Sequence, residues 1–264
     1  MDKQMSILKR QLQTERLRRN KLESQLRGQT RAIHRYRQVC RKNETYPPAI
    51  RDCQDVYEYI SRKHGVFEIQ PKNGPKMSVF CEDGWTVFQS REDGSVTFDR
   101  DWEEYKHGFG KPSAEYWLGN ENIHYVSRQK SYKLMVELGD WEGRSANAIY
   151  DSFKIENEQG FYRLHLGKFV TGAARDGLRF HESIGHGGSV NGMAFSTRDR
   201  DHDKSSRNCA KLYNGGWWYN DCFWSNLNGD YVYKGGVFSD KFTWFPWKMN
   251  HYSLKTSKMK LKPT

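Results

Sequence analysis

The chain has 264 residues, of which 36% are hydrophobic and 14% aromatic, and its 23 glycines indicate a loop-rich domain with an aromatic core. The net charge of +11 is uneven: residues 1–46 carry 13 basic and 4 acidic side chains, whereas residues 47–264 carry 30 and 28. A nearly neutral main domain argues against nucleic acid as a partner. No run of 18 apolar residues occurs, so no transmembrane segment is expected.

Residues 1–42 are predicted to form a coiled-coil helix that makes the protein a homo-oligomer. The heptad a and d positions hold Met1, Met5, Leu8, Leu12, Glu15, Arg19, Leu22, Leu26, Gln29, Ile33, Tyr36 and Cys40. Glu15 and Arg19 interrupt the apolar stripe at a spacing that permits an ion pair. The alternative is a lone amphipathic helix. The positive charge of this segment is either a solvated helix surface or a means of attracting anionic glycans or membranes.

Residues 43–50 are expected to form a linker. It contains the sequon Asn43-Glu44-Thr45, a candidate N-glycosylation site, followed by a stiffening Pro47-Pro48. From residue 51 onward, short β-like runs alternate with glycine-containing turns, which predicts an α+β domain with antiparallel sheets. We expect strands at 66–70, 77–81, 85–89 and 132–138 and helices at 53–61, 100–109 and 121–127.

The five cysteines leave at least one without a partner in the chain. Cys40 falls on an a position at the end of the predicted coil, where identical residues of neighbouring chains face each other. An interchain disulfide is therefore expected, with a free thiol as the alternative. No Cys-x-x-Cys motif or compact Cys/His quartet supports zinc.

Residues 196–229 hold the most specific pattern. Asp199, Asp201 and Asp203 alternate just before a short segment bounded by Cys209 and Cys222, and alternating carboxylates are hard ligands suited to calcium. An EF-hand loop is excluded, because its sixth and twelfth positions, which require Gly and Glu, hold Lys204 and Ala210. The alternative is a solvated acidic turn whose charge is balanced by Arg198, Arg200 and Lys204.

Together with this segment, a series of motifs in one order resembles the C-terminal domain of the fibrinogen-related family. The motifs are GWTV at 84–87, DGS at 93–95, FG at 109–110, EYWLGNE at 115–121, RLHLG at 163–167, YSLK at 252–255 and MKLKP at 259–263. The resemblance implies a fibrinogen C-terminal-like domain over residues 51–264. Its expected parts are an N-terminal subdomain (51–95), a central sheet (96–188), a calcium and ligand-binding subdomain (189–250) and a C-terminal strand returning to the sheet (251–264).

The resemblance also implies how the cysteines pair and which residues bind Ca²⁺. The family pairs cysteines at the places of Cys53 with Cys81 and of Cys209 with Cys222; closing the second loop is worth about 3 kcal/mol in the chain-entropy model. The family's calcium ligands map to the carboxylates of Asp201 and Asp203 and the backbone carbonyls of Ser205 and Arg207. Asp199 would be a supporting acid. Disulfides favour an oxidising compartment, so we expect a secreted protein whose native start lies upstream, since no signal peptide is visible.

In family members that bind acetylated sugars, a cis peptide precedes the second loop cysteine, and two backbone N–H groups face the ligand. The matching bond is Asp221–Cys222, with donors at Cys222 and Phe223. The aromatic wall maps to Tyr213 and Phe238, followed by Ser239. Phe223 stands where many such members carry His, which removes a polar contact. Fibrin-forming members place acids at the positions of Tyr213 and Ser239, so a fibrin-like hole is not expected.

These features predict a secreted, calcium-dependent, lectin-like recognition protein that binds acetylated or related glycans on microbial or cell surfaces through several heads. The resemblance implies a role in innate immune pattern recognition or agglutination. The alternative is a signalling ligand or matrix protein that docks a cell-surface receptor. Trp217 and Trp218 are expected to be core residues rather than ligand platforms. An enzyme is not expected, because His165, His181, His186 and His202 accompany no nucleophile motif such as Gly-x-Ser-x-Gly.

Overall fold

The computed structural model describes residues 13, 15–20, 22–23, 49–179, 188–237 and 241–264. The chain divides into two compact units, Met1–Ala49 and Ile50–Thr264. In the first unit, residues 13, 15–20 and 22–23 are helical. There, Glu15 forms an ion pair with Arg18 (3.3 Å), and Arg19 forms one with Glu23 (3.2 Å). Neither is the Glu15–Arg19 pair that the sequence spacing permits. Most of the predicted coiled coil, Cys40 and the sequon at Asn43 lie outside the described residues.

The second unit has the α+β composition that the sequence predicts, and the expected fibrinogen C-terminal-like fold is confirmed. Its elements are α2 (Cys53–Tyr59), β1 (His64–Ile69), β2 (Met77–Glu82), β3 (Trp85–Arg91), α3 (Trp102–His107), β4 (Phe109–Gly110), β5 (Tyr116–Trp117), α4 (Asn120–Arg128), β6 (Tyr132–Gly139), β7 (Ser145–Tyr150), β8 (Phe153–Ile155), a 3₁₀ turn (Glu158–Gly160), β9 (Leu164–Leu166), β10 (Phe169–Thr171), α5 (Cys209–Tyr213), β11 (Ser225–Asn226), β12 (Thr243–Trp244), α6 (Phe245–Lys248) and β13 (Thr256–Pro263). The predicted subdomain boundaries within this unit stay predictions.

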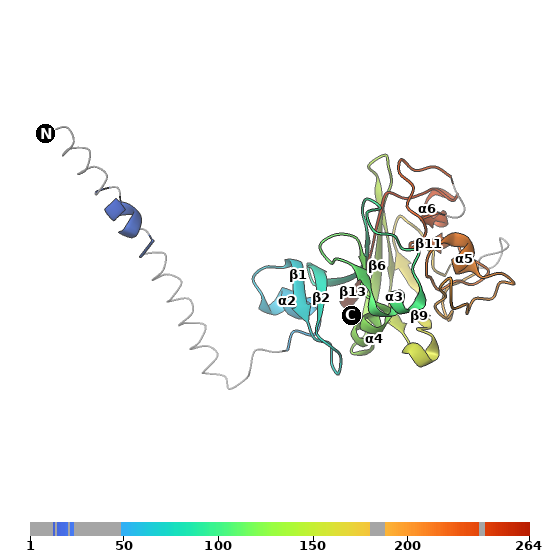
Figure 1. Ribbon diagram of the computed structural model, residues 1–264, viewed down its shortest axis with the longest axis horizontal. Coiled ribbons are helices and arrows are strands. Elements are labelled where there is room, and N and C mark those ends of the chain that lie inside the picture. The colour runs from blue at the N-terminus through green and yellow to red at the C-terminus, as the bar shows by residue number, and fades with distance from the viewer. Residues whose placement is uncertain (1–12, 14, 21, 24–48, 180–187, 238–240) are drawn as a thin grey trace. The chain divides into compact units, whose positions relative to one another are not determined.

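A nine-stranded antiparallel sheet organises the unit, with the strand order β1-β2-β3-β13-β6-β7-β10 and β4 and β5 attached beside β3. The C-terminal strand β13 lies in the middle, paired on one side with β3 and on the other with β6. Figure 1 shows β1, β2 and α2 at one end of the unit and α5, α6 and β11 at the other, with the long strands between them. No described helix is long and apolar enough to span a lipid bilayer.

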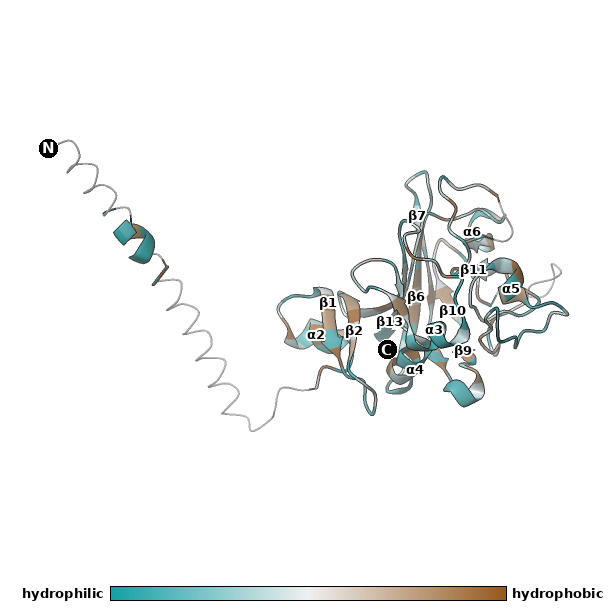
Figure 2. Ribbon diagram, in the orientation of Figure 1, coloured by the Kyte–Doolittle hydropathy of each residue, from teal (hydrophilic) through white to brown (hydrophobic). Residues whose placement is uncertain are grey.

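Alternating burial along the strands explains how the sheet is held. In β6, every second side chain from Tyr132 to Leu138 is buried, and those between are half-buried, so one face packs on the core and the other meets solvent. Figure 2 shows the hydrophobic residues concentrated on the strands, whereas α3 presents hydrophilic ones. The α3 helix begins with a capping box, in which Asp101 and Glu104 each accept a hydrogen bond from the other's backbone N–H.

The core is unusually rich in aromatic rings, as the composition predicts. Trp217 and Trp218 are fully buried, so they are core residues and not ligand platforms. The Trp218 ring lies 5.2 Å from that of Phe195 and 6.0 Å from that of Trp117, and its indole N–H donates to the carbonyl of Tyr162. These contacts join the segment that carries the predicted site to the central sheet and fix its position.

A buried charge pair joins β3 to the distal loops. Glu115 and Arg91 are each 1% exposed, and the Nε of Arg91 lies 3.8 Å from the Oε1 of Glu115. The Glu115 carboxylate accepts hydrogen bonds from four backbone N–H groups, those of Glu92, Asp93, Gly94 and Val96. The Arg91 guanidinium donates to the carbonyls of Leu227 (3.3 Å) and Gly229 (3.0 Å), just beyond β11. Burial lowers the pKa of Arg91, although nearby acids partly offset the effect.

Candidate functional site

The segment with alternating aspartates is tied to the core at its start. Ser196 and Trp217 form a β-bridge with hydrogen bonds in both directions. Asp199 accepts one hydrogen bond from the backbone N–H of Trp102, at the start of α3, and another from the hydroxyl of Thr197. Asp199 therefore anchors the loop to α3.

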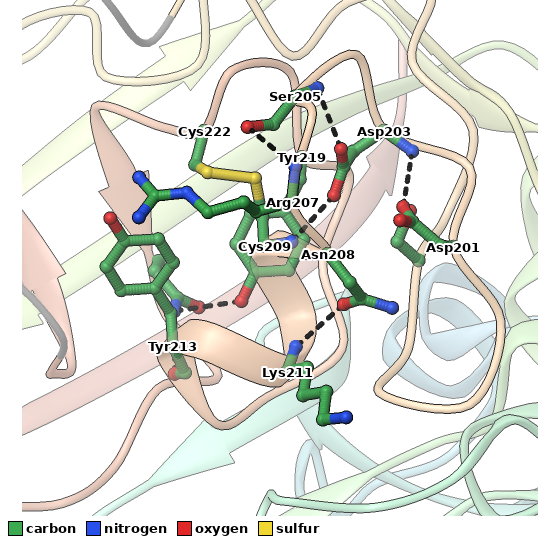
Figure 3. The surroundings of a disulfide bond; sticks show 12 residues. Asp201, Asp203, Ser205, Arg207, Asn208, Cys209, Lys211, Tyr213, Tyr219 and Cys222 are labelled. Atoms are coloured by element: carbon green, nitrogen blue, oxygen red, sulfur yellow. Dashed lines mark hydrogen bonds between the residues drawn. A yellow bond between two sulfur atoms is a disulfide. The ribbon is translucent and has the colours of Figure 1, made fainter.

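Asp201 and Asp203 lie next to each other in the loop that leads to Cys209 (Figure 3). The N–H of Asp203 donates to Oδ1 of Asp201 (3.2 Å), while the Asp203 carboxylate accepts from the N–H groups of Ser205 and Cys209, each at 2.8 Å. Burial and the neighbouring charge of Asp201 raise the pKa of Asp203 to about 6, even though both backbone hydrogen bonds lower it. Two carboxylates that repel each other in this way fit a site for a divalent cation.

The remaining predicted ligands, the carbonyls of Ser205 and Arg207, lie between Asp203 and α5. Asn208 caps α5 by accepting a hydrogen bond from the N–H of Lys211. Across the residues that the structure describes, no three His, Cys, Asp or Glu side chains form a cluster that could hold a metal ion. A cation here would therefore depend on two carboxylates and on backbone oxygens, an all-oxygen ligand set that suits calcium better than zinc, which is bound mainly by Cys and His.

The second disulfide closes the loop beside these acids. Cys209 pairs with Cys222, and Cys53 pairs with Cys81, as the family resemblance implies. The Asp221–Cys222 peptide bond is cis. The N–H of Lys204 donates to the carbonyl of Asn220, and the N–H of Asn220 donates to that of Cys222, so the acidic loop and the cystine loop share hydrogen bonds. Within the described residues, the N–H groups of Cys222 and Phe223 donate to no protein acceptor.

The side chain of Phe223 packs against two tyrosines. The rings of Tyr213 and Phe223 pack edge to face with their centroids 4.8 Å apart, and Tyr219 lies behind Phe223 at 5.9 Å. Tyr213 is half-buried and Phe223 is 7% exposed. The other predicted wall residues, Phe238 and Ser239, lie outside the described residues. The structure thus brings Tyr213, Cys222 and Phe223 together beside the Asp201–Asp203 pair.

Sequence reasoning missed His251, whose ring centroid lies 6.3 Å from that of Phe223 and 5.1 Å from that of Phe245. Its Nδ1 is buried without a hydrogen-bond partner in the described chain, and burial lowers its pKa, so the imidazole is neutral at pH 7. It restores a polar ring near the position where Phe223 replaces the family's usual His. The only signal was its place directly before Tyr252 in the YSLK motif. Of the four histidines considered for catalysis, His181 and His186 lie outside the described residues.

Ion pairs hold the outer edge of this region to the central sheet. Asp140, at the end of β6, is 2% exposed; its carboxylate binds the ammonium of Lys248 in α6 (2.5 Å) and the guanidinium of Arg144 (2.7 Å). Burial would raise the pKa of Asp140, but these two cations and the N–H of Arg144 hold it well below its usual range. The Asp140–Lys248 ion pair therefore fixes α6 and, through it, the chain that leads to His251.

We expect Asp140→Asn to lower the free energy of unfolding by about 2–3 kcal/mol at pH 7, because two charge-assisted hydrogen bonds are lost. A lowered native pKa gives stability that is present above the unfolded pKa, near 4, and disappears as the pH falls through the native value. The difference should therefore be constant between pH 5 and 8 and shrink below pH 4 in urea titrations. Glu142→Gln, at an exposed partner of Arg144, should change stability by less than about 0.5 kcal/mol.

Paired aspartates beside a disulfide-closed loop, together with a sheet that has a central C-terminal strand, define a fibrinogen-like globular domain. Residues 49–264 match the family described as fibrinogen beta and gamma chains, C-terminal globular domain, and the chain belongs to that family. The family is a generally non-enzymatic one.

Relatives of several kinds share this domain. The chain is 42% identical over 230 residues to human Angiopoietin-related protein 7 (83% of this chain, 64% of the relative) and 40% identical over 231 residues to Ryncolin-4 of Cerberus rynchops (85% and 64%). Among solved structures, it is similar to the fibrinogen-like globe domain of human ANGPTL2, with 41% identity and a TM-score of 0.75 over 81% of this chain and 99% of that one. A lamprey fibrin D-dimer in complex with a Gly-His-Arg-Pro-amide peptide matches with 32% identity and a TM-score of 0.77, over 99% of this chain and 92% of that one. The chain spans about 64% of the length of the first two relatives.

Proposed function

We propose that this chain is a secreted, calcium-dependent recognition protein whose fibrinogen-like heads bind acetylated or related glycans. The observation that carries the proposal is the meeting of three features at one place. These are the Asp201–Asp203 carboxylate pair, the uncommitted N–H groups of Cys222 and Phe223, and the aromatic contact of Tyr213 with Phe223. Secretion is supported by the two disulfides, which persist in oxidising compartments.

Ca²⁺ would be held by the carboxylates of Asp201 and Asp203 and the carbonyls of Ser205 and Arg207. Bound there, the ion would supply the positive charge that offsets two neighbouring acids. The chain's own residues supply the link to the pocket, because Asp203 accepts from the N–H of Cys209, whose sulfur is bonded to that of Cys222. An ordered acidic loop therefore fixes the cysteine at which the backbone donors lie.

The donors and rings have complementary roles toward an N-acetyl group. The N–H groups of Cys222 and Phe223 would donate to the acetyl carbonyl, and the rings of Tyr213 and Phe223 would receive the methyl. Phe238 and Ser239 complete the proposed wall. A small contact of this kind gives weak affinity, so the proposed coiled coil, with Cys40 as an interchain disulfide, would provide avidity by presenting several heads.

A glycan array with and without a chelator tests the proposal. We expect N-acetylated sugars to bind in calcium and not in EDTA. Tyr213→Ala should weaken binding about tenfold or more, because it removes an apolar wall worth at least 1.4 kcal/mol. Tyr59→Ala, at an exposed tyrosine of α2, is the matched control and should bind as the unsubstituted chain does. Calcium-independent binding, or equal binding by both variants, would contradict the proposal.

A second candidate function is docking to a cell-surface receptor through a larger protein surface. It is favoured by three exposed apolar side chains in the same subdomain, namely Tyr233 (72%), Val237 (63%) and Met249 (50%). The names of Angiopoietin-related protein 7 and the ANGPTL2 globe domain point in the same direction. No binding on the array, with retained binding to a cell-surface protein, would favour this function.

A further inference from the structure

A cavity of about 700 Å³ lies on the central sheet, and none of its lining residues belongs to the acidic loop or the cystine loop. A smaller cavity of about 120 Å³ shares Glu92 and Lys258 with it, so the two hollows flank one lysine. The larger volume falls within the range of small-ligand sites. The cavity therefore has the size of a binding site, and its lining determines which ligand it suits.

The strand register shows how the floor of the cavity is built. Lys258, Glu137 and Asn147 are cross-strand partners on β13, β6 and β7, so their side chains share one face of the sheet. A second row of partners lies two positions away on the same face: Thr256 on β13, Gly139 on β6 and Ser145 on β7. The hollow arises because this second row has only small side chains, whereas the first row has long ones.

Glycines at two positions shape the cavity: one leaves its floor open, and the other lets its wall approach β7. A Cβ atom on Gly139 would come within 2.3 Å of the Thr256 hydroxyl, so a side chain there would force Thr256 to move. The wall beyond β10 approaches β7 at Gly172, where φ is +138° and a Cβ would lie 2.1 Å from the carbonyl of Asn147. The N–H of Ala174 donates to that same carbonyl (2.9 Å), and Ala173 lines the cavity.

Most charged side chains in and around the cavity already have partners. The Lys258 ammonium lies 3.3 Å from Glu82, and Lys260 binds both Glu82 (2.6 Å) and Glu137 (2.7 Å). Arg91, at the edge, points toward Glu115 and the carbonyls beyond β11. An ionic ligand would have to compete with these pairs, so the charges do not favour one.

Three uncharged polar side chains of the cavity, in contrast, have no hydrogen-bond partner among the described residues. In the described chain, the side chains of Ser145, Asn147 and Thr256 form no hydrogen bond with protein, and all three line the cavity. Two hydroxyls and one amide offer donors and acceptors together, and the free carboxylate oxygen of Glu137 adds an acceptor. This set matches the hydroxyl groups of a sugar, each of which both donates and accepts.

We infer that this cavity is a second saccharide subsite, which binds neutral, unacetylated sugar units and does not require calcium. The inference deepens the proposed glycan recognition and rests on it for the identity of the ligand class. A second contact on the same head would let one head hold a longer glycan at two points and would raise its affinity without a new subunit.

The test titrates the full chain, in EDTA, with neutral unacetylated hexasaccharides of glucose and of mannose, and follows binding by NMR. We expect one of them to bind. Ser145→Trp should abolish binding by filling the hollow, since an aromatic residue suits an exposed strand position. Asn147→Ala should weaken it at least fivefold. Ser78→Trp, at an exposed serine of β2, is the matched control and should leave binding unchanged.

The outcomes separate this inference from the proposed function. Ser145→Trp should keep calcium-dependent binding of acetylated sugars, and Tyr213→Ala should keep binding of the hexasaccharide. The inference is overturned if neither hexasaccharide binds, if Ser145→Trp binds as well as Ser78→Trp, or if binding requires calcium or Tyr213. Selective binding of a charged peptide at this face would also overturn it.

Discussion

Glu115→Ala is expected to lower the free energy of unfolding by about 3–5 kcal/mol, the largest effect of any single substitution proposed here. The Glu115 carboxylate is buried and accepts four backbone N–H groups from residues 92–96, while it faces the buried guanidinium of Arg91. Its removal leaves a buried cation without its counter-charge and four donors without acceptors. Equilibrium urea unfolding measures the change.

A matched control is available in the same domain. Glu68, on β1, forms an exposed ion pair with Lys76 at 3.0 Å, and Glu68→Ala should change stability by less than about 1 kcal/mol. Glu115→Gln should fall between the two, because the amide oxygen can still accept hydrogen bonds but carries no charge to balance Arg91. Equal stabilities for the Glu115→Ala and Glu68→Ala variants would contradict this account of the buried pair.

Asp203→Asn is expected to reduce the proposed calcium affinity by about 100-fold, because it removes one of only two carboxylates from the site. The change is nearly isosteric, but the amide keeps only one acceptor oxygen, so either Ser205 or Cys209 loses the acceptor of its N–H group. The melting temperature without calcium therefore reports the change in loop structure, and the calcium affinity reports the loss of charge. Calorimetric titration with calcium measures the affinity, and the rise in melting temperature on adding calcium gives an independent measurement.

Asp83→Asn provides the control for this variant, since Asp83 is an exposed aspartate at the turn between β2 and β3. It should bind calcium as the unsubstituted chain does. If Asp203→Asn retains its calcium affinity within about twofold, Asp203 is not a ligand, and the acidic loop is then the solvated turn that the sequence left open.

Local features of the fold were predictable where a pattern carried them. The run at 132–138 alternates because β6 has one buried face, and the expected helix at 121–127 is α4 almost to the residue. The return of a C-terminal strand to the sheet came from the family resemblance, but the central position of β13 was not predicted, because the alternation in residues 256–263 does not say which strands are its neighbours.

Long-range pairings account for what the sequence could not predict. Glu115 and Arg91 are 24 positions apart, and neither stands out among the charged residues until the fold brings them together. His251 reaches Phe223 only because α6 turns the chain back, and the cavity over Ser145 exists only because three strands align their small residues. Within the candidate site, Asp199 was assigned a supporting role, but its anchoring contact with α3 was not anticipated.

The position of β13 affects how the protein is made. This strand separates β3 from β6, so the two halves of the sheet cannot join until residues 256–263 have been synthesised and have cleared the exit tunnel. Until then, the facing edges of both halves are open to chaperones or to unwanted strand pairing.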